Sequence, residues 1–182
     1  MKKIIQKYWQ IVSIAVVIVG LDQWTKSLVR ANIPLGGRWL PEGMEWLDPY
    51  ARIVHWYNTG AAFGMFKDGS MVFTVLAFIV IILILYYYPQ VEGADWSLRI
   101  AMSMQLGGAA GNLIDRLTIG HVTDFISVGT FAVFNIADAS ISVGAAVLFL
   151  GIWMMERAEK KKKQEMAEQE RTSETQSEVT SE

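Results

Sequence analysis

The chain has 182 residues, of which 52% are hydrophobic, and it carries a formal net charge of −2. Its length corresponds to one domain, and a mean hydropathy of +0.29 is high for a soluble globular protein. The absence of cysteine excludes disulfides, thiolate metal sites and a cysteine nucleophile. Two histidines argue against a histidine-based metal cluster. We therefore expect no metal, no cofactor and no nucleic-acid partner.

The first apolar segment spans about residues 9–28 and follows a basic start that contains Lys2, Lys3 and Lys7. A signal peptide begins in the same way, but no small-residue cleavage pattern follows this segment. Its length of about 20 residues matches the thickness of the bilayer hydrocarbon. The sequence therefore predicts a retained membrane helix.

Residues 31–67 differ in composition, with proline, glycine and alternating residues. Residues 44–58 predict short strands broken by a turn at Asp48–Pro49, and the stretch after Asn58 predicts a turn into a short amphipathic piece. The section is longer than a connection needs to be. Its aromatic side chains suggest that it lies at the membrane surface; they are Trp39, Trp46, Trp56 and Tyr57.

Three further apolar segments span about residues 70–88, 97–117 and 133–155. The segment 97–117 is the most polar of them, but Gly107 and Gly111 form a GxxxG pair that suits a helix packed inside a bundle. We expect residues 1–155 to form one all-α membrane domain, a four-helix bundle with the extracytoplasmic section 31–67. The charged stretch 156–182 predicts a disordered cytoplasmic tail, because its hydrophobicity is low.

Four spans place both termini on the same side of the membrane. The lysines and arginines near both termini put that side in the cytoplasm, although the section 31–67 also contains arginines. This topology brings the polar ends of the first, third and fourth segments to the outer face of the membrane. The residues gathered there are Asp22, Asn112, Asp115, Asp124, Asn135 and Asp138.

Asp124 lies in the short link between the last two segments, and Asp138 lies about one turn into the last one. Two neighbouring carboxylates in an apolar site cannot both ionise easily, so one of them keeps a proton. Such a pair can activate water and polarise a carbonyl group, which is peptide hydrolysis without a metal. The alternative is that each aspartate caps a helix or pairs with Arg116.

Two pairs of polar residues stand at i, i+3: Asn112 with Asp115, and Asn135 with Asp138. Asn112 also precedes Arg116 by four residues. These side chains can orient a substrate amide or hold the catalytic carboxylates. A structural hydrogen-bond network between helices is the alternative, and for Asp115 with Arg116 the two interpretations are balanced.

Other polar residues have simpler interpretations. Asp22 and Lys26 stand at i, i+4, where an interfacial ion pair is favoured over a role in the site. Asn58 can be a simple turn residue, and His55 and His121 are isolated histidines for which a catalytic role is not favoured.

Other enzyme classes lack support, because neither GxSxG nor HExxH occurs in the chain. Two non-proteolytic functions remain open. Intramembrane carboxylates can relay ions or protons in a small transporter or channel, and GxxxG packing can serve a non-catalytic assembly factor. A transporter predicts polar residues throughout the membrane depth, whereas here they gather at one face.

Five motifs occur in register. They are DQWTK at 22–26, NTGAAFG at 58–64, GGAAGNLIDR at 107–116, VTDFI at 122–126 and FNIAD at 134–138. Together they resemble the bacterial lipoprotein signal peptidases, or signal peptidase II, over about residues 9–155. The resemblance implies four membrane helices, an extracytoplasmic β-rich cradle and a short surface helix.

The resemblance further implies an aspartic protease of the bacterial cytoplasmic membrane that acts from the outer face. It would remove the signal peptide of prolipoproteins by cutting before a diacylglyceryl-modified cysteine, with Asp124 and Asp138 as the catalytic pair. Its partners would be lipidated prolipoproteins, membrane lipid and peptide antibiotics such as globomycin, which would bind the pair. Further residues match positions that line or support the site: Asp22, Lys26, Asn58, Gly108, Asn112, Asp115, Arg116 and Asn135.

Overall fold

The computed structural model describes residues 2–60, 69–91 and 96–179. Within these ranges the chain forms four long helices, a three-stranded sheet and two short 3₁₀ helices. The helices are α1 (Lys2–Asn32), α2 (Ser70–Tyr87), α3 (Trp96–Ile119) and α4 (Ile136–Val179). The other elements are β1 (Arg38–Trp39), η1 (Glu45–Leu47), β2 (Ala51–Asn58), η3 (Tyr88–Gln90) and β3 (Val122–Val128).

Helix α3 is the centre of the bundle and packs most extensively against α4 and α1. Its small residues allow this close approach. A Cβ atom on Gly107 would lie 2.8 Å from the Cβ of Ile18, and one on Gly108 would lie 2.5 Å from the carbonyl oxygen of Ala137. The structure thus confirms the predicted small-residue packing of this segment.

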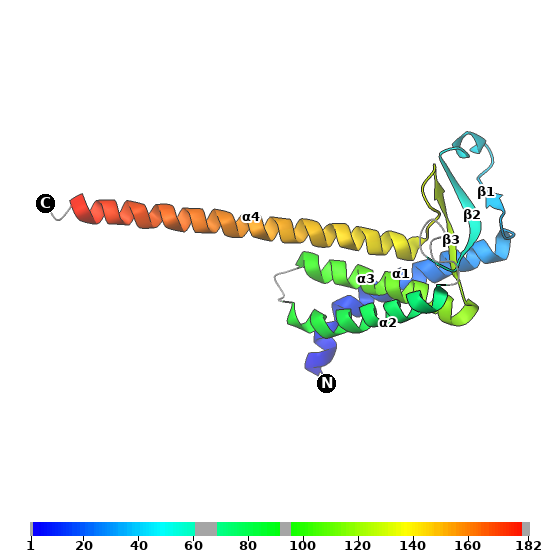
Figure 1. Ribbon diagram of the computed structural model, residues 1–182, viewed down its shortest axis with the longest axis horizontal. Helices are drawn as coiled ribbons and strands as arrows, with labels where there is room; N and C mark the ends of the chain where they lie inside the picture. Colours follow the sequence, from blue (N-terminus) through cyan, green and yellow to red (C-terminus); the bar gives the residue numbers. More distant parts are fainter. Residues whose placement is uncertain (1, 61–68, 92–95, 180–182) are drawn as a thin grey trace.

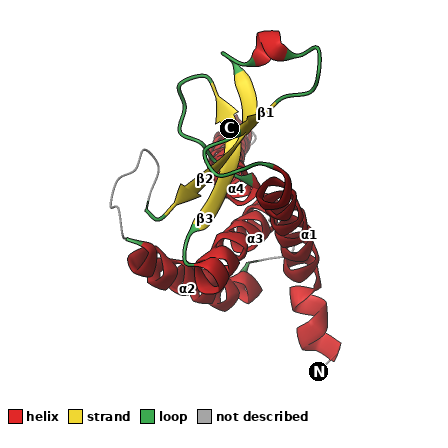
Figure 2. Cartoon of the chain, turned by 90° about the vertical axis from the view of Figure 1, so that its right-hand side faces the viewer, coloured by secondary structure: helices red, strands yellow, loops and turns green. Residues whose placement is uncertain are grey.

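The sheet lies across one end of the helices, while α4 continues far beyond the opposite end (Figure 1). The strand order is β1-β2-β3, and both pairings are antiparallel. Seen along the helices, the sheet stands over the end of the bundle (Figure 2). The sequence predicted strands within 31–67, but β3 comes from the link between α3 and α4. Residues 45–47 form η1 and no strand. The short amphipathic piece expected after Asn58 falls on residues 61–68, outside the described ranges.

Three helical stretches are long and apolar enough to cross a membrane: Tyr8–Asn32, Ser70–Gln90 and Ile136–Met166. They overlap the predicted segments 9–28, 70–88 and 133–155. The predicted segment 97–117 falls within α3, which is not among these three because of its polar residues. Helix α2 is the most apolar, and Ile84 is its only residue that is buried in the described part of the chain. Its exposed apolar surface suits lipid.

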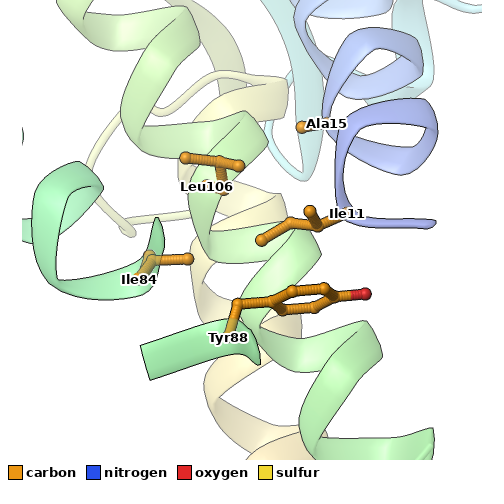
Figure 3. Close-up of a cluster of buried hydrophobic side chains, with 5 residues drawn as sticks. All are labelled: Ile11, Ala15, Ile84, Tyr88 and Leu106. Atoms are coloured by element: carbon orange, nitrogen blue, oxygen red, sulfur yellow. The ribbon is translucent and has the colours of Figure 1, made fainter. Parts of the chain in front are cut away.

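Two apolar clusters hold the bundle and the sheet together. One joins α1, α2, η3 and α3 and consists of Ile11, Ala15, Ile84, Tyr88 and Leu106 (Figure 3). The other consists of Val29, Ile33 and Phe125, with Ile53 and Ile126 of the sheet packed against it. The second cluster fixes the sheet to the end of α1.

Helix α4 remains helical through Val179, where the sequence predicted a disordered tail. This stretch is rich in glutamate, lysine and glutamine, which favour helix even without a core. Lys161 and Glu165 form an i, i+4 ion pair at 3.6 Å, and the Arg157 guanidinium lies 3.9 Å from the centre of the Trp153 ring.

Candidate active site

Polar side chains are buried where α1, α3, β3 and the start of α4 meet beneath the sheet. The sequence predicted this convergence, and the structure brings all six expected residues to this end of the bundle. Five of the six are buried and Asp138 is half-buried; the set is Asp22, Asn112, Asp115, Asp124, Asn135 and Asp138.

Asp138 lies in the first turn of α4, and Asn135 directly precedes that helix. The Asn135 backbone N–H donates to Asp138 Oδ2 at 3.2 Å, and the Asp138 backbone N–H donates to Asn135 Oδ1 at 2.9 Å. This reciprocal pair is a capping box. The other carboxylate oxygen, Oδ1, accepts from Asn112 Nδ2 at 2.8 Å. Asp138 therefore caps its helix, as the alternative interpretation held, and still turns one oxygen toward α3.

Asp124 lies in the middle of β3 and is held by two asparagine amides. Asn135 Nδ2 donates to its Oδ1 at 2.7 Å, and Asn58 Nδ2 donates to its Oδ2 at 2.8 Å. Asn58 ends β2, which pairs with β3, so the sheet itself positions this contact. Asn135 contacts both carboxylates and links Asp124 to Asp138. We call these two aspartates the dyad.

The environment of Asp124 favours its protonated form. The side chain is only 2% exposed, and this burial raises its pKa to about 7. The nearby charge of Asp138 raises the pKa further, while hydrogen bonds from Asn58 and Asn135 and the charge of Lys26 oppose the shift. A carboxyl group of this kind keeps its proton at slightly acidic pH and releases it near neutrality.

A second group of buried charges lies beside the dyad, and we call Asp22, Lys26 and Asp115 the lysine cluster. Lys26 Nζ lies 2.8 Å from Asp22 Oδ2 and 3.2 Å from Asp115 Oδ2, and each of these side chains is at most 1% exposed. The predicted i, i+4 ion pair of Asp22 with Lys26 is therefore present, and it is buried. Packing of α1 against α3 covers the pair and adds a second carboxylate to the lysine.

The two aspartates of the lysine cluster also tie neighbouring elements together. Asp22 Oδ1 accepts the backbone N–H of Ala137 at 3.0 Å, and Asp115 Oδ2 accepts that of Thr123 at 3.0 Å. The cluster touches the site through Lys26 Nζ, which donates to Asn112 Oδ1 at 2.9 Å. It thereby fixes the start of α4 and the strand that carries Asp124.

The sequence suggested Arg116 as a partner of Asp115 or of the two dyad aspartates. In the described part of the chain Asp115 forms ion pairs with Lys26 and Arg30, and none with Arg116. The Arg116 guanidinium lies 5.6 Å from the centre of the Phe73 ring, and its buried Nε has no hydrogen-bond partner among the described residues. It interacts electrostatically with both members of the dyad.

A cavity of about 650 Å³ opens between α2, α3 and α4. Asn58, Asn112, Arg116 and Asp138 line it near the sheet, and most of the remaining wall is apolar. An apolar groove with a few convergent polar groups is the usual form of a ligand site. Because Gly108 lets α4 lie directly against α3, Asp138 can reach Asn112 across this cavity wall.

Three residues of this region were not expected to belong to the site. Arg30 lies 3.5 Å from Asp115 Oδ1 and donates to the Thr123 hydroxyl at 3.1 Å, and Gln23 donates to Asp115 Oδ1 at 3.1 Å. The spacing of Asp22, Lys26 and Arg30 at i, i+4, i+8 was a signal that could have identified Arg30.

The histidines form a separate group. His55 Nδ1 lies 2.7 Å from the Ile33 carbonyl oxygen, and the His121 ring lies 3.8 Å from the centre of the Tyr57 ring. The His55 ring also packs edge-on against this tyrosine, with the ring centres 5.4 Å apart. The histidines thus brace the sheet beside the dyad.

The chain is similar to known proteins over most of its length. The sequence profile of the family described as Signal peptidase (SPase) II matches residues 14–154. The lipoprotein signal peptidase of Halalkalibacterium halodurans is 38% identical over 82% of this chain and 96% of its own length. That of Symbiobacterium thermophilum is 37% identical over 79% of this chain and 94% of its own.

A solved structure described as a bacterial membrane enzyme, determined by the in meso method at 2.3 Å resolution, superposes with a TM-score of 0.72. It is 28% identical, and the match covers 79% of this chain and 87% of that one. The family match and the shared fold lead to one conclusion: this chain belongs to the signal peptidase II family of bacterial lipoprotein signal peptidases.

Proposed function

We propose that this peptidase is a membrane aspartic endopeptidase that removes the signal peptide from diacylglyceryl-modified prolipoproteins by cutting before the lipidated cysteine. The observation that carries the proposal is the dyad itself. Asp124 and Asp138 are joined through Asn135, and Asp138 lies in the wall of an apolar cavity between candidate membrane helices. A lipid-anchored scissile bond needs this combination of an apolar groove and a polar end.

In the proposed mechanism Asp138 is the general base and Asp124 is the acid. Asp138 accepts hydrogen bonds from the Asn112 amide of α3 and from the Asn135 backbone N–H, and it lies at the N-terminus of α4, where the helix dipole favours a carboxylate. Asp124, with a pKa raised to about 7, holds the proton. Asp138 takes a proton from a water molecule while the oxygen of that water attacks the scissile carbonyl carbon. Asp124 donates a hydrogen bond to the carbonyl oxygen and then protonates it. When the C–N bond breaks, Asp138 gives its proton to the leaving amine, and Asp124 recovers its own.

The surrounding residues have supporting roles in this proposal. Asn58, Asn112 and Asn135 orient the carboxylates, and the unpartnered face of Arg116 balances the negative charge that develops in the transition state. Asp22, Lys26 and Asp115 hold α1, β3 and α4 in register, and Gly108 lets the helices close around the site. Their burial supports a positioning role without direct substrate contact.

The proposed topology follows from the position of the dyad. Helix α3 would be the fourth membrane span, shielded from lipid by α1, α2 and α4, which it contacts. Both termini would then lie in the cytoplasm, and the sheet and the dyad would lie at the outer face of the cytoplasmic membrane (Figure 1). The basic residues of α4 beyond its apolar part support this orientation, namely Arg157, Lys160, Lys161, Lys162 and Lys163.

The deciding experiment compares two substrates of the purified chain, a diacylglyceryl-modified precursor and the same precursor without lipid. We expect cleavage of the lipidated precursor only, with the modified cysteine as the new N-terminus by mass spectrometry. Equal cleavage of both forms would contradict the proposal.

The metal-free mechanism and the inhibitor class are tested separately. Activity should persist in EDTA, and a loss that zinc reverses would refute the two-aspartate scheme. Globomycin should compete with substrate, and Asp138→Asn should weaken its binding if the inhibitor occupies the dyad.

A further inference from the structure

A glutamine in the floor of the cavity is not accounted for by the dyad or by helix packing. Gln105 lies near the middle of α3, is half-buried and lines the cavity of about 650 Å³. Its amide has no hydrogen-bond partner in the part of the chain that the structure describes, whereas Asn112 on the same helix is fully engaged. An unpaired amide in an apolar membrane environment is costly. Such a group therefore suggests a ligand.

Gln105 lies in line with the dyad but deeper in the bundle. It precedes Asn112 by seven residues, which is two helical turns on the same face, or about 10 Å along the helix axis. The same cavity is also lined by the apolar residues Leu76, Val80 and Ile141. A Cβ atom on Gly144 would lie 3.3 Å from the Gln105 Cγ, so α4 leaves room for this side chain.

The space for a ligand continues past Gln105. A second cavity of about 500 Å³ is also lined by Gln105 and runs between α2 and α3 toward η3, past Leu83, Met102 and Gln90. Gln105 is thus a wall residue of both cavities. A long apolar chain that begins at the dyad and enters the bilayer along α3 would pass this amide.

We propose that the Gln105 amide donates a hydrogen bond to a carbonyl oxygen of the lipidated precursor and thereby contributes to substrate specificity. The acceptor is either an ester carbonyl of the diacylglyceryl group or a backbone carbonyl of the signal peptide. About three extended residues span the 10 Å between Asn112 and Gln105, so the peptide can also place a carbonyl at this depth. The inference rests on the proposed function, because it assumes that the precursor occupies the cavity.

The test uses the purified full-length chain in lipid nanodiscs and two precursors, one with ester-linked acyl chains and one with ether-linked alkyl chains. The variants are Gln105→Met and Gln105→Leu, which remove the donor and keep an apolar side chain of similar length. Ile79→Met is the control, because Ile79 is an exposed apolar residue of α2 that lines neither cavity. We expect both Gln105 variants to raise KM for the ester precursor about three- to tenfold and to leave kcat within about twofold.

The ether precursor identifies the acceptor. If the ester carbonyl accepts, the variants and the wild type have the same KM for the ether precursor. If the peptide backbone accepts, the increase in KM persists. Unchanged KM on both precursors overturns the inference, as does an equal increase of KM in Ile79→Met.

Melting temperatures separate binding from folding. In a Gln105 variant that keeps the wild-type melting temperature, a change in KM reports substrate binding. If neither variant folds, Gln105 is structural and the inference is overturned. Failure of the proposed function has a different signature, because the wild type itself would then leave the lipidated precursor intact.

Discussion

Two pairs of carboxylates lie side by side at the sheet end of the bundle, and they differ in the groups that hold them. In the lysine cluster, Asp22 and Asp115 share the Lys26 ammonium and are at most 1% exposed. In the dyad, Asp124 and Asp138 are held only by amide and backbone N–H groups.

The difference separates a structural role from a chemical one. A lysine between two carboxylates pairs with both of them, and these ion pairs hold the packed elements together. Asparagine amides fix the geometry of a carboxylate without adding a cation, and burial together with the charge of Asp138 raises the pKa of Asp124 to about 7. The dyad also borders the cavity through Asp138, whereas the lysine cluster lies behind it. Four predictions test this contrast.

The largest effect is expected at the dyad. Asp124→Asn or Asp138→Asn should reduce the rate of precursor cleavage on the order of 10³-fold or more, because each removes a proton-transfer group. The melting temperature in detergent should change little, since the amide keeps the size of the side chain. Full activity of either purified variant would remove the dyad from the mechanism.

The next effect concerns the lysine cluster. Lys26→Met should lower the free energy of unfolding by about 3 to 5 kcal/mol, because it leaves two buried carboxylates without their shared cation. Denaturant unfolding in detergent measures this loss. Asp115→Asn serves as the companion variant, and we expect it to retain kcat for the molecules that remain folded. If Lys26→Met and the wild type had the same free energy of unfolding, the cluster would contribute nothing to stability.

Helix packing links the two groups. A Cβ atom on Gly108 would lie 2.5 Å from the Ala137 carbonyl oxygen, so Gly108→Ala should push α3 and α4 apart and cost about 1 to 3 kcal/mol of stability. Activity should fall as well, because Asp138 moves away from Asn112. Gly20→Ala is the control, since a Cβ atom there has no neighbour within 4 Å. Equal stability of both variants would contradict the close approach.

The smallest effect is a shift in pH dependence. Asp124 must be protonated to act as the acid, so kcat/KM should decline as pH rises through about 7. The hydrogen bond from Asn58 lowers the pKa of Asp124, so Asn58→Leu should raise that pKa and move the decline to higher pH. Asn32→Leu replaces an exposed asparagine at the end of α1 and should leave the profile unchanged. A shift to lower pH in Asn58→Leu would contradict the assignment of the acid.

Much of the helical architecture could be predicted from the sequence. Long apolar runs have few alternatives to membrane helices, so the segments 9–28, 70–88 and 133–155 appear in α1, α2 and α4. The glycines of α3 predicted close packing, because a helix face without side chains allows a neighbouring helix to approach closely. The gathering of the polar residues at one end followed from topology alone.

The sequence by itself determined which residues are candidates for the chemistry, because aspartates and asparagines in apolar surroundings are costly unless they are used. Only the tertiary structure decided how they divide. In the folded chain Asp22 and Lys26 are buried, and Asp115 forms an ion pair with Lys26. Strand β3 pairs with β2, and this pairing places the Asn58 amide against Asp124. These outcomes depend on contacts between residues up to 115 positions apart, such as Asp22 with Ala137. Local patterns reach only the next helical turn or the neighbouring strand residue, so no spacing along the chain could distinguish the two carboxylate pairs.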